Sequence, residues 1–198
     1  MPIVVYPELW GHPRALGFGF DDALTGLAPV GDGFRRQNLL ADLALAQADA
    51  AVVASRSQQT SFPALLQPQL TLLPEGVDLE RIKPDRQARL SLPEHGLELK
   101  AGQPLVTLIS RNLEPLRGLR QALRTWPLVR QQFPQAQLLL VGRQRQGYGV
   151  EAPHGESHLM DALEGIDCGG ISVLNWLPHP QMLQLLRCSG CHLALSYP

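Results

Sequence analysis

Two arginines lie in a short segment of the sequence that could bind a phosphorylated ligand. Residues 110–118 read SRNLEPLRG and carry Arg111 and Arg117 directly after an apolar run. Guanidinium groups match the geometry of phosphate oxygens and hold them through paired hydrogen bonds. We expect this pair to bind a diphosphate, while the same spacing also fits two surface arginines in a solvated loop.

A glycine follows a second apolar run. Gly142 comes directly after residues 137–141 and opens the stretch GRQRQGYG. A glycine at such a point lets a ligand approach the backbone closely. The stretch lacks the GxGxxG spacing of dinucleotide-binding loops, so an ordinary solvated loop stays open as an alternative.

Other reactive side chains give weaker signals. Cys188 and Cys191 form a CxxC without a second pair, which is too few ligands for a tetrahedral zinc site, and we expect two packed thiols. The run HGESH at 154–158 lacks the order His-Glu-x-x-His of metalloproteases. We therefore predict no metal site and no cofactor.

Alternating strands and helices must position the two arginines and the glycine. Apolar runs predict strands at 2–6, 51–53, 70–73, 105–109, 137–141, 171–174 and 193–195. Helical spacing predicts helices at 35–49, 56–66 with Ser55 as N-cap, 116–133, 158–165 and 180–187. This alternation predicts an α/β fold with parallel sheets, in which ligands bind beyond the carboxyl ends of strands. Arg120 is expected on the outer face of helix 116–133.

The chain divides at a charged segment that contains prolines. We interpret residues 79–103 as a linker between two Rossmann-like units, residues 1–78 and 104–198. The sequence begins and ends on patterns typical of buried strands, which normally lie inside a sheet. We therefore expect the chain to be a slice of a longer protein.

Composition excludes several function classes. With 17 basic and 18 acidic residues the net charge is −1, whereas nucleic-acid binders carry a basic excess. A hydrophobic content of 44% is too high for a disordered tail. No run of about 18 apolar residues predicts a membrane-spanning helix. Three cysteines and no visible secretory signal favour the cytoplasm.

Three stretches together resemble a known family. SRNLEPLRGLRQALRTWPLVRQQFPQAQLLLVG at 110–142 resembles the start of the second Rossmann-like domain in family 4 glycosyltransferases of the GT-B fold. ISVLNWLPHPQMLQLLRCSGCHLALSYP at 171–198 is similar to a bacterial subgroup of that family. The stretch 48–84, which contains the tripeptide GVD, resembles the end of the first domain. The resemblance covers roughly residues 36–198.

The resemblance implies a retaining transfer of a sugar from a nucleotide diphosphate sugar to a hydroxyl of a glycan, a lipid or another acceptor. It implies no metal, because basic side chains neutralise the diphosphate leaving group. The residues that it places on the donor side are Arg111 and Arg117 for the diphosphate, and Gly142, Trp176 and Leu177 for the nucleotide. Glu8 and His12 are candidates for the acceptor side, and peripheral contact with the inner membrane is an expectation.

The sequence also departs from the family. Arg143 and Asn175 stand where its members usually have glycine, and the sequence ends before the segment of the family's glutamate pair. We assign no catalytic residue and expect this chain alone to be inactive. A non-catalytic remnant that binds nucleotide or a protein partner is the alternative. Another GT-B enzyme, such as an epimerase or phosphorylase, fits the Arg-x5-Arg spacing less well.

Overall fold

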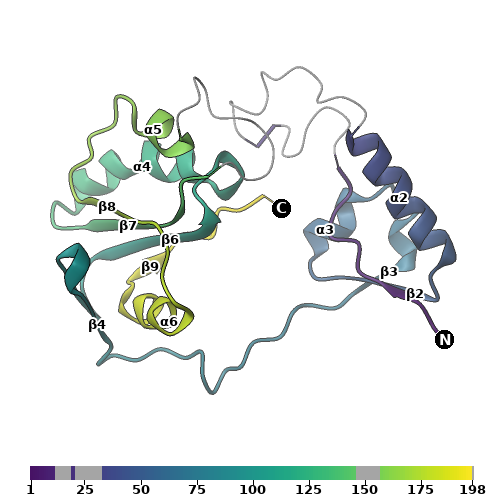
Figure 1. Cartoon of the computed structure of the whole chain (residues 1–198), viewed down its shortest axis with the longest axis horizontal. Coiled ribbons are helices and arrows are strands. Elements are labelled where there is room, and N and C mark those ends of the chain that lie inside the picture. The colour runs from purple at the N-terminus through teal and green to yellow at the C-terminus, as the bar shows by residue number, and fades with distance from the viewer. Residues whose placement is uncertain (12–18, 21–32, 146–156, 198) are drawn as a thin grey trace. The chain divides into compact units, whose positions relative to one another are not determined.

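The structure is a computed structural model that describes residues 1–11, 19–20, 33–145 and 157–197 (Figure 1). The chain divides into two compact units, Met1–Val77 and Asp78–Tyr197. Each unit contains its own parallel sheet, and the strands predicted at 51–53 and 105–109 lie in different sheets. The predicted α/β class with parallel sheets is therefore confirmed.

The first unit is a small parallel sheet with helices. Its strands, in the spatial order β1-β2-β3, are Val4–Val5, Ala50–Val53 and Leu70–Leu72. Its helices are α2 (Gly33–Gln47), α3 (Arg56–Ser61) and the 3-10 turn η1 (Gln67–Gln69). Buried side chains from these elements, Leu45, Ala51, Val53, Phe62 and Leu70, form its core. The ring of Trp10 lies 5.6 Å from that of Phe62 and extends this core.

Helix α3 begins as the sequence predicts and ends early. Ser55 Oγ accepts from the backbone N–H of Gln58 at 3.1 Å, and Gln58 Oε1 accepts from the N–H of Ser55 at 3.0 Å. This reciprocal capping box confirms Ser55 as the N-cap. The helix stops at Ser61 rather than at residue 66, because the residue before Pro63 is disfavoured in helical geometry.

The second unit is a four-stranded parallel sheet with the order β8-β7-β6-β9. These strands are Ile171–Leu174, Gln137–Arg143, Leu105–Asn112 and Cys191–His192. The helices are α4 (Leu119–Gln132), α5 (His158–Leu163) and α6 (His179–Cys188), with the 3-10 turn η3 (Pro115–Arg117) before α4. Alternate residues of β6 and β7 face opposite sides, so α4 and α5 cover one face of the sheet and α6 the other.

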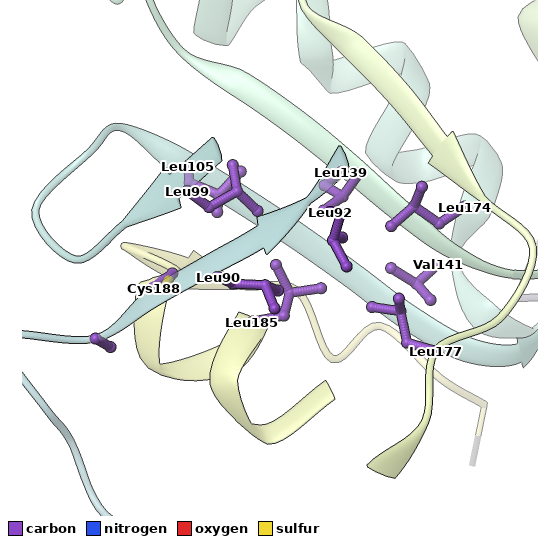
Figure 2. Close-up of a cluster of buried hydrophobic side chains, with 11 residues drawn as sticks. Leu90, Leu92, Leu99, Leu105, Leu139, Val141, Leu174, Leu177, Leu185 and Cys188 are labelled. Atoms are coloured by element: carbon purple, nitrogen blue, oxygen red, sulfur yellow. The ribbon is translucent and has the colours of Figure 1, made fainter. Parts of the chain in front are cut away.

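The segment expected to be a linker is part of the second unit. It contains strands β4 (Arg89–Leu92) and β5 (Leu97–Lys100), which pair antiparallel around the 3-10 turn η2 (Pro93–His95). Their buried side chains Leu90, Leu92 and Leu99 pack against the sheet and α6 (Figure 2). The interpretation of 79–103 as a linker was therefore wrong, because alternate leucines of this hairpin complete a hydrophobic core.

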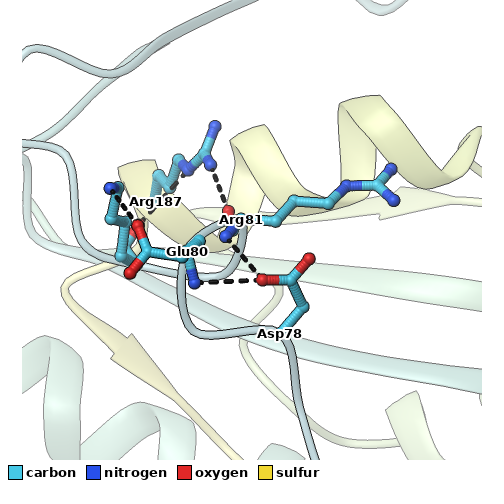
Figure 3. Close-up of polar contacts among 5 residues, drawn as sticks. Asp78, Glu80, Arg81 and Arg187 are labelled. Atoms are coloured by element: carbon cyan, nitrogen blue, oxygen red, sulfur yellow. Dashed lines mark hydrogen bonds and ion pairs between the residues drawn. The ribbon is translucent and has the colours of Figure 1, made fainter.

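Residues 78–83, which follow the GVD glycine and valine, are held against α6. The carboxylate of Asp78 accepts from the backbone N–H groups of Glu80 and Arg81 at 3.0 and 3.1 Å. Arg187 of α6 donates to the carbonyls of Arg81 and Lys83 at 2.7 and 3.3 Å (Figure 3). The anchored segment 78–83 thus begins the second unit.

The last strand lies earlier than predicted. The sequence predicts a strand at 193–195, but β9 pairs Cys191 and His192 with Val106 and Thr107 of β6. The buried hydroxyl of Thr107 lies 2.9 Å from Ser189 Oγ and 3.1 Å from His192 Nδ1. These polar contacts hold the chain beside β6 at 191–192, which the apolar pattern does not reveal.

No helix in the part of the chain that the structure describes is both long and apolar enough to cross a bilayer.

Candidate functional site

A cavity lies at the carboxyl ends of three adjacent strands of the second unit. Its volume is about 460 Å³, within the range of ordinary ligand pockets. The lining residues come from β6 (Ile109, Ser110, Arg111), β7 (Val141, Gly142, Arg143), the loop after β8 (Asn175, Trp176, Leu177) and α6 (Met182). This is the edge at which open parallel sheets bind their ligands.

An irregularity in β6 lies at the residues that line the cavity. Strands β6 and β7 pair regularly up to Ile109 and Val141, and the register then shifts before Asn112 pairs with Arg143. Ser110 and Arg111 lie in this shift, and Ser110 Oγ donates to the carbonyl of Asn112 at 2.6 Å. Bulges of this kind redirect side chains, and here the redirected residue is an arginine at the cavity.

Gly142 is required by the close approach of the two strands. A Cβ at this position would lie 2.8 Å from the carbonyl oxygen of Ser110 and 3.1 Å from the side chain of Leu113. Any larger residue would push β6 and β7 apart at the point where both enter the cavity. The structure thus gives this glycine a packing role, in addition to the ligand approach that the sequence predicts.

Trp176 and Leu177 have different environments. Leu177 is only 6% exposed and packs with Val141 and Leu174 in the core (Figure 2). Trp176 is 60% exposed and lines the cavity from the loop after β8. Leu177 therefore anchors the loop, and the neighbouring indole ring is available to a ligand.

Arg117 is not among the residues that line this cavity. It lies in η3, and its Nε is 3.5 Å from Oε1 of Glu114, which is 1% exposed. The structure thus brings Arg111 together with Gly142, Trp176 and Leu177, but places Arg117 beside a buried carboxylate. The predicted contact of Arg117 with a diphosphate stays a prediction.

Arg143 and Asn175 also line the cavity, although the sequence pattern did not predict them as site residues. In the resemblance they are departures from the family's glycines, yet both line the cavity. A basic residue directly after the glycine of a strand end was the available signal. With Arg111, the cavity has two guanidinium groups, and none of its described lining residues is acidic.

The other predicted residues lie elsewhere. Glu8 is exposed in the first unit, and His12 lies outside the described residues. Arg120 was expected on the outer face of its helix, but its guanidinium pairs with Asp161, and both side chains are about four-fifths buried. The expectation was wrong because α5 packs beside α4 at this point. Cys188 is buried as expected, whereas Cys191 is exposed.

A larger cavity of about 630 Å³ lies between α4 and strands β6 and β9. Its described lining residues carry no charge, and most are apolar, including Leu105, Trp126, Phe133 and Leu193. Phosphate groups need hydrogen-bonding or charged partners when they leave water. The smaller cavity with two arginines is therefore the better candidate for an anionic ligand.

The chain is similar to known glycosyltransferases. Residues 1–82 match the family described as "Glycosyl transferase family 4 group". Over 98 residues, which are 48% of this chain, it is 35% identical to a GDP-mannose-dependent alpha-(1-6)-phosphatidylinositol monomannoside mannosyltransferase of Mycolicibacterium smegmatis. This match spans 25% of that relative's length. The two findings support a family 4 glycosyltransferase, in agreement with the resemblance seen in the sequence.

Proposed function

We propose that this chain, as a family 4 glycosyltransferase, takes part in transferring a sugar from a nucleotide diphosphate sugar to an acceptor hydroxyl. The observation that supports this proposal best is the cavity at the ends of β6, β7 and β8, which contains Arg111. In this reaction the bond from the sugar's anomeric carbon to the diphosphate oxygen breaks, and a bond to the acceptor oxygen forms. The resemblance favours retention of the anomeric configuration.

The cavity residues suit the donor's leaving group and base. The guanidinium of Arg111 can hold the diphosphate through charge-assisted hydrogen bonds and offset the charge that develops on the leaving oxygen. The exposed indole of Trp176 offers a flat surface on which a nucleobase can stack. Leu177 fixes the loop, and Gly142 keeps the strand ends close. Arg117, which pairs with the buried Glu114, keeps its predicted diphosphate contact as part of this proposal.

The relative's name suggests the first substrates to test. Because that protein depends on GDP-mannose, we propose GDP-mannose as the first donor. Its acceptor is a phosphatidylinositol monomannoside, so a lipid-linked glycan is a reasonable acceptor class for this chain as well. A lipid acceptor would bring a cytoplasmic enzyme to a membrane surface. Glu8 and His12 keep their predicted acceptor role as part of this proposal.

Nucleotide binding tests the proposal directly. Isothermal titration calorimetry of the 198-residue chain with GDP and UDP should detect binding, and Arg111→Ala should weaken it by at least about tenfold. Arg145→Ala is the matched control, because this arginine is exposed and does not line the cavity. Absence of binding by the unaltered chain, or equal affinities of the two variants, would contradict the proposed donor site.

A further inference from the structure

Helix α2 of the first unit carries leucines on the side that faces away from the core. Leu45 of this helix is 5% exposed and packs in the core of the unit. At 3.6 residues per turn, Leu43 lies about 160° around the helix from Leu45, and Leu39 and Leu40 lie on either side of Leu43. The exposed fractions of Leu39, Leu40 and Leu43 are 61%, 67% and 59%. The outer side of α2 is therefore apolar as well as the inner side.

These three leucines, which we call the leucine face, have the pattern of a contact surface. Single exposed leucines are common on proteins, but residues at positions i, i+1 and i+4 of one helix form a continuous patch. A helix that is apolar on both sides is normally covered on both. Rows of leucines on one helix pack into the grooves of another. The leucine face therefore fits a second helix.

Charged side chains beside the leucine face indicate which helix this is. Arg35 and Arg36 are exposed in the first turn of α2, and Asp42 is exposed further along. Arg35 and Asp42 are seven residues apart, which is close to two full turns, so they lie on the same side of α2. An antiparallel copy of α2, centred on Leu39 and Leu40, would bring its Asp42 within about 3–5 Å of the level of Arg35 along the axis. Opposite charges of α2 can thus pair across a two-fold axis.

We infer that α2 is a self-association surface, on which two copies of this chain pack antiparallel through the leucine face. The arginines at the start of each α2 then lie near Asp42 of the other copy, which gives two equivalent sets of ion pairs. An anionic lipid surface would attract the arginines but repel the carboxylate of Asp42 beside the same leucines. A contact between two helices is small, so we expect reversible association at about 10–100 µM chain. This inference does not depend on the proposed donor site.

Sedimentation equilibrium of the 198-residue chain, at about 1–200 µM, tests this contact. The unaltered chain should pass from monomer to dimer over this range. Leu43→Ser should weaken the association by at least about tenfold, because each of the two chains loses an apolar side chain from the centre of the contact. Leu128→Ser is the matched control, since Leu128 is a leucine of α4 with a similar exposed fraction of 63%. A chain that stays monomeric, or equal effects of the two variants, would overturn the inference.

Charge reversal tests the antiparallel pairing. Asp42→Arg should weaken self-association by about tenfold, and so should the double variant Arg35→Asp/Arg36→Asp, because like charges then meet across the two-fold axis. A mixture of these two variant chains should associate at least as tightly as the unaltered chain, since opposite charges meet again. If the mixture associates no more tightly than either variant alone, the antiparallel contact is refuted.

Thermal unfolding and vesicle binding distinguish this contact from other roles of the leucine face. All substituted side chains are exposed, so we expect unchanged unfolding midpoints. If the midpoint of Leu43→Ser does fall, the mixture of charge variants decides, because its outcome depends on pairing between chains. Co-sedimentation with vesicles of phosphatidylcholine and phosphatidylinositol tests a lipid surface. If the chain stays monomeric and binds these vesicles, and Leu43→Ser but not Leu128→Ser abolishes this binding, the leucine face contacts a membrane and the inference is overturned.

Discussion

The guanidinium of Arg187 donates a hydrogen bond of 2.7 Å to the backbone carbonyl of Arg81, 106 residues earlier in the chain. The same guanidinium donates to the carbonyl of Lys83 at 3.3 Å and to the side chain of Gln184 at 3.0 Å. One side chain of α6 thus holds the anchored segment 78–83 against the second unit. The arginine fork is suited to this task, because its fixed donors can reach two carbonyls at once.

Replacing Arg187 should release the anchored segment. We expect Arg187→Ala to lower the free energy of unfolding of the second unit by about 1–2 kcal/mol, because two backbone carbonyls lose a charged donor. The free energy of unfolding of Arg187→Lys should lie between those of Arg187→Ala and the unaltered chain, since an ammonium group cannot span both carbonyls in the same way. Urea denaturation measures the change, with exposed Arg86→Ala as the control. Equal losses of unfolding free energy in Arg187→Ala and Arg86→Ala would show that the hydrogen bonds from Arg187 to the anchored segment add nothing to stability.

Arg117 should matter first for stability. Glu114 is 1% exposed, so Arg117→Ala leaves a buried carboxylate without its nearby cation and should cost about 1–3 kcal/mol of unfolding free energy. Glu114→Gln in the Arg117→Ala background should recover part of this loss, because a neutral amide needs no cation. Urea denaturation of the unaltered chain, Arg117→Ala, Glu114→Gln and the double variant gives the coupling energy between the two side chains.

Calorimetry of the same Arg117→Ala variant separates the two roles of this arginine. If Arg117 also contacts the diphosphate, GDP or UDP affinity falls at a temperature at which the variant is fully folded. Unchanged affinity together with a clear loss of stability would assign Arg117 to the Glu114 pair alone. Unchanged stability would contradict the pair as a structural feature.

Gly142 should not tolerate a methyl group. The Cβ of Gly142→Ala would lie 2.8 Å from the Ser110 carbonyl oxygen, so β6 and β7 must shift apart. We expect a stability loss of about 1–3 kcal/mol, as for other overpacked sites, and weaker nucleotide binding because the strand ends carry Arg111 and Arg143. Gly76→Ala is the control, since nothing lies within 4 Å of its added Cβ. Thermal unfolding and calorimetry measure the two effects. If Gly142→Ala and Gly76→Ala have the same unfolding midpoint and the same nucleotide affinity, the steric requirement at Gly142 is ruled out.

Local signals in the sequence predicted most helices and strands. They failed where contacts with residues far away in the chain determine whether a strand forms and where it lies. Ser55 and Gln58 form their capping box within four residues, so the start of α3 is visible in the sequence. The sequence did not predict the hairpin of β4 and β5, because Pro93 and many charged residues lie among its alternating leucines and are typical of a linker. Those leucines become informative only when α6, more than 80 residues later, packs against them. The shift of β9 likewise depends on contacts with Thr107.

In the candidate site, too, some features follow from the local sequence and others only from three-dimensional packing. Arg111 and Gly142 follow neighbouring strands, and parallel topology alone predicts that they lie close together. Which arginine accompanies Arg111 could not be read from spacing. The answer depends on the register shift in β6 and on the buried carboxylate of Glu114, and both arise from three-dimensional packing. In the sequence, Arg143 stands out only as a departure from the family's glycine.

His192 gives the second unit a pH-dependent contact. His192 is exposed by its accessible surface, but neighbouring atoms partly desolvate its imidazole, and this desolvation lowers the pKa of His192 below its ordinary value of 6.5, while a hydrogen bond with the backbone of Thr107 opposes the shift. A lowered pKa means that the unfolded chain binds the proton more readily than the folded one. The neutral imidazole therefore contributes stability that is present above pH 6.5 and is lost as the pH falls through the lower folded pKa.

Urea denaturation at a series of pH values tests this contribution. Between about pH 7.5 and pH 5.5 the free energy of unfolding of the second unit should fall, and it should fall less in His192→Gln, which cannot take up the proton. The glutamine keeps a polar side chain near Thr107, so the difference between the two curves reports titration rather than lost packing. Exposed His95 offers the control, because His95→Gln removes an imidazole outside this contact. Parallel curves for the unaltered chain and His192→Gln would show that protonation of His192 is not linked to folding.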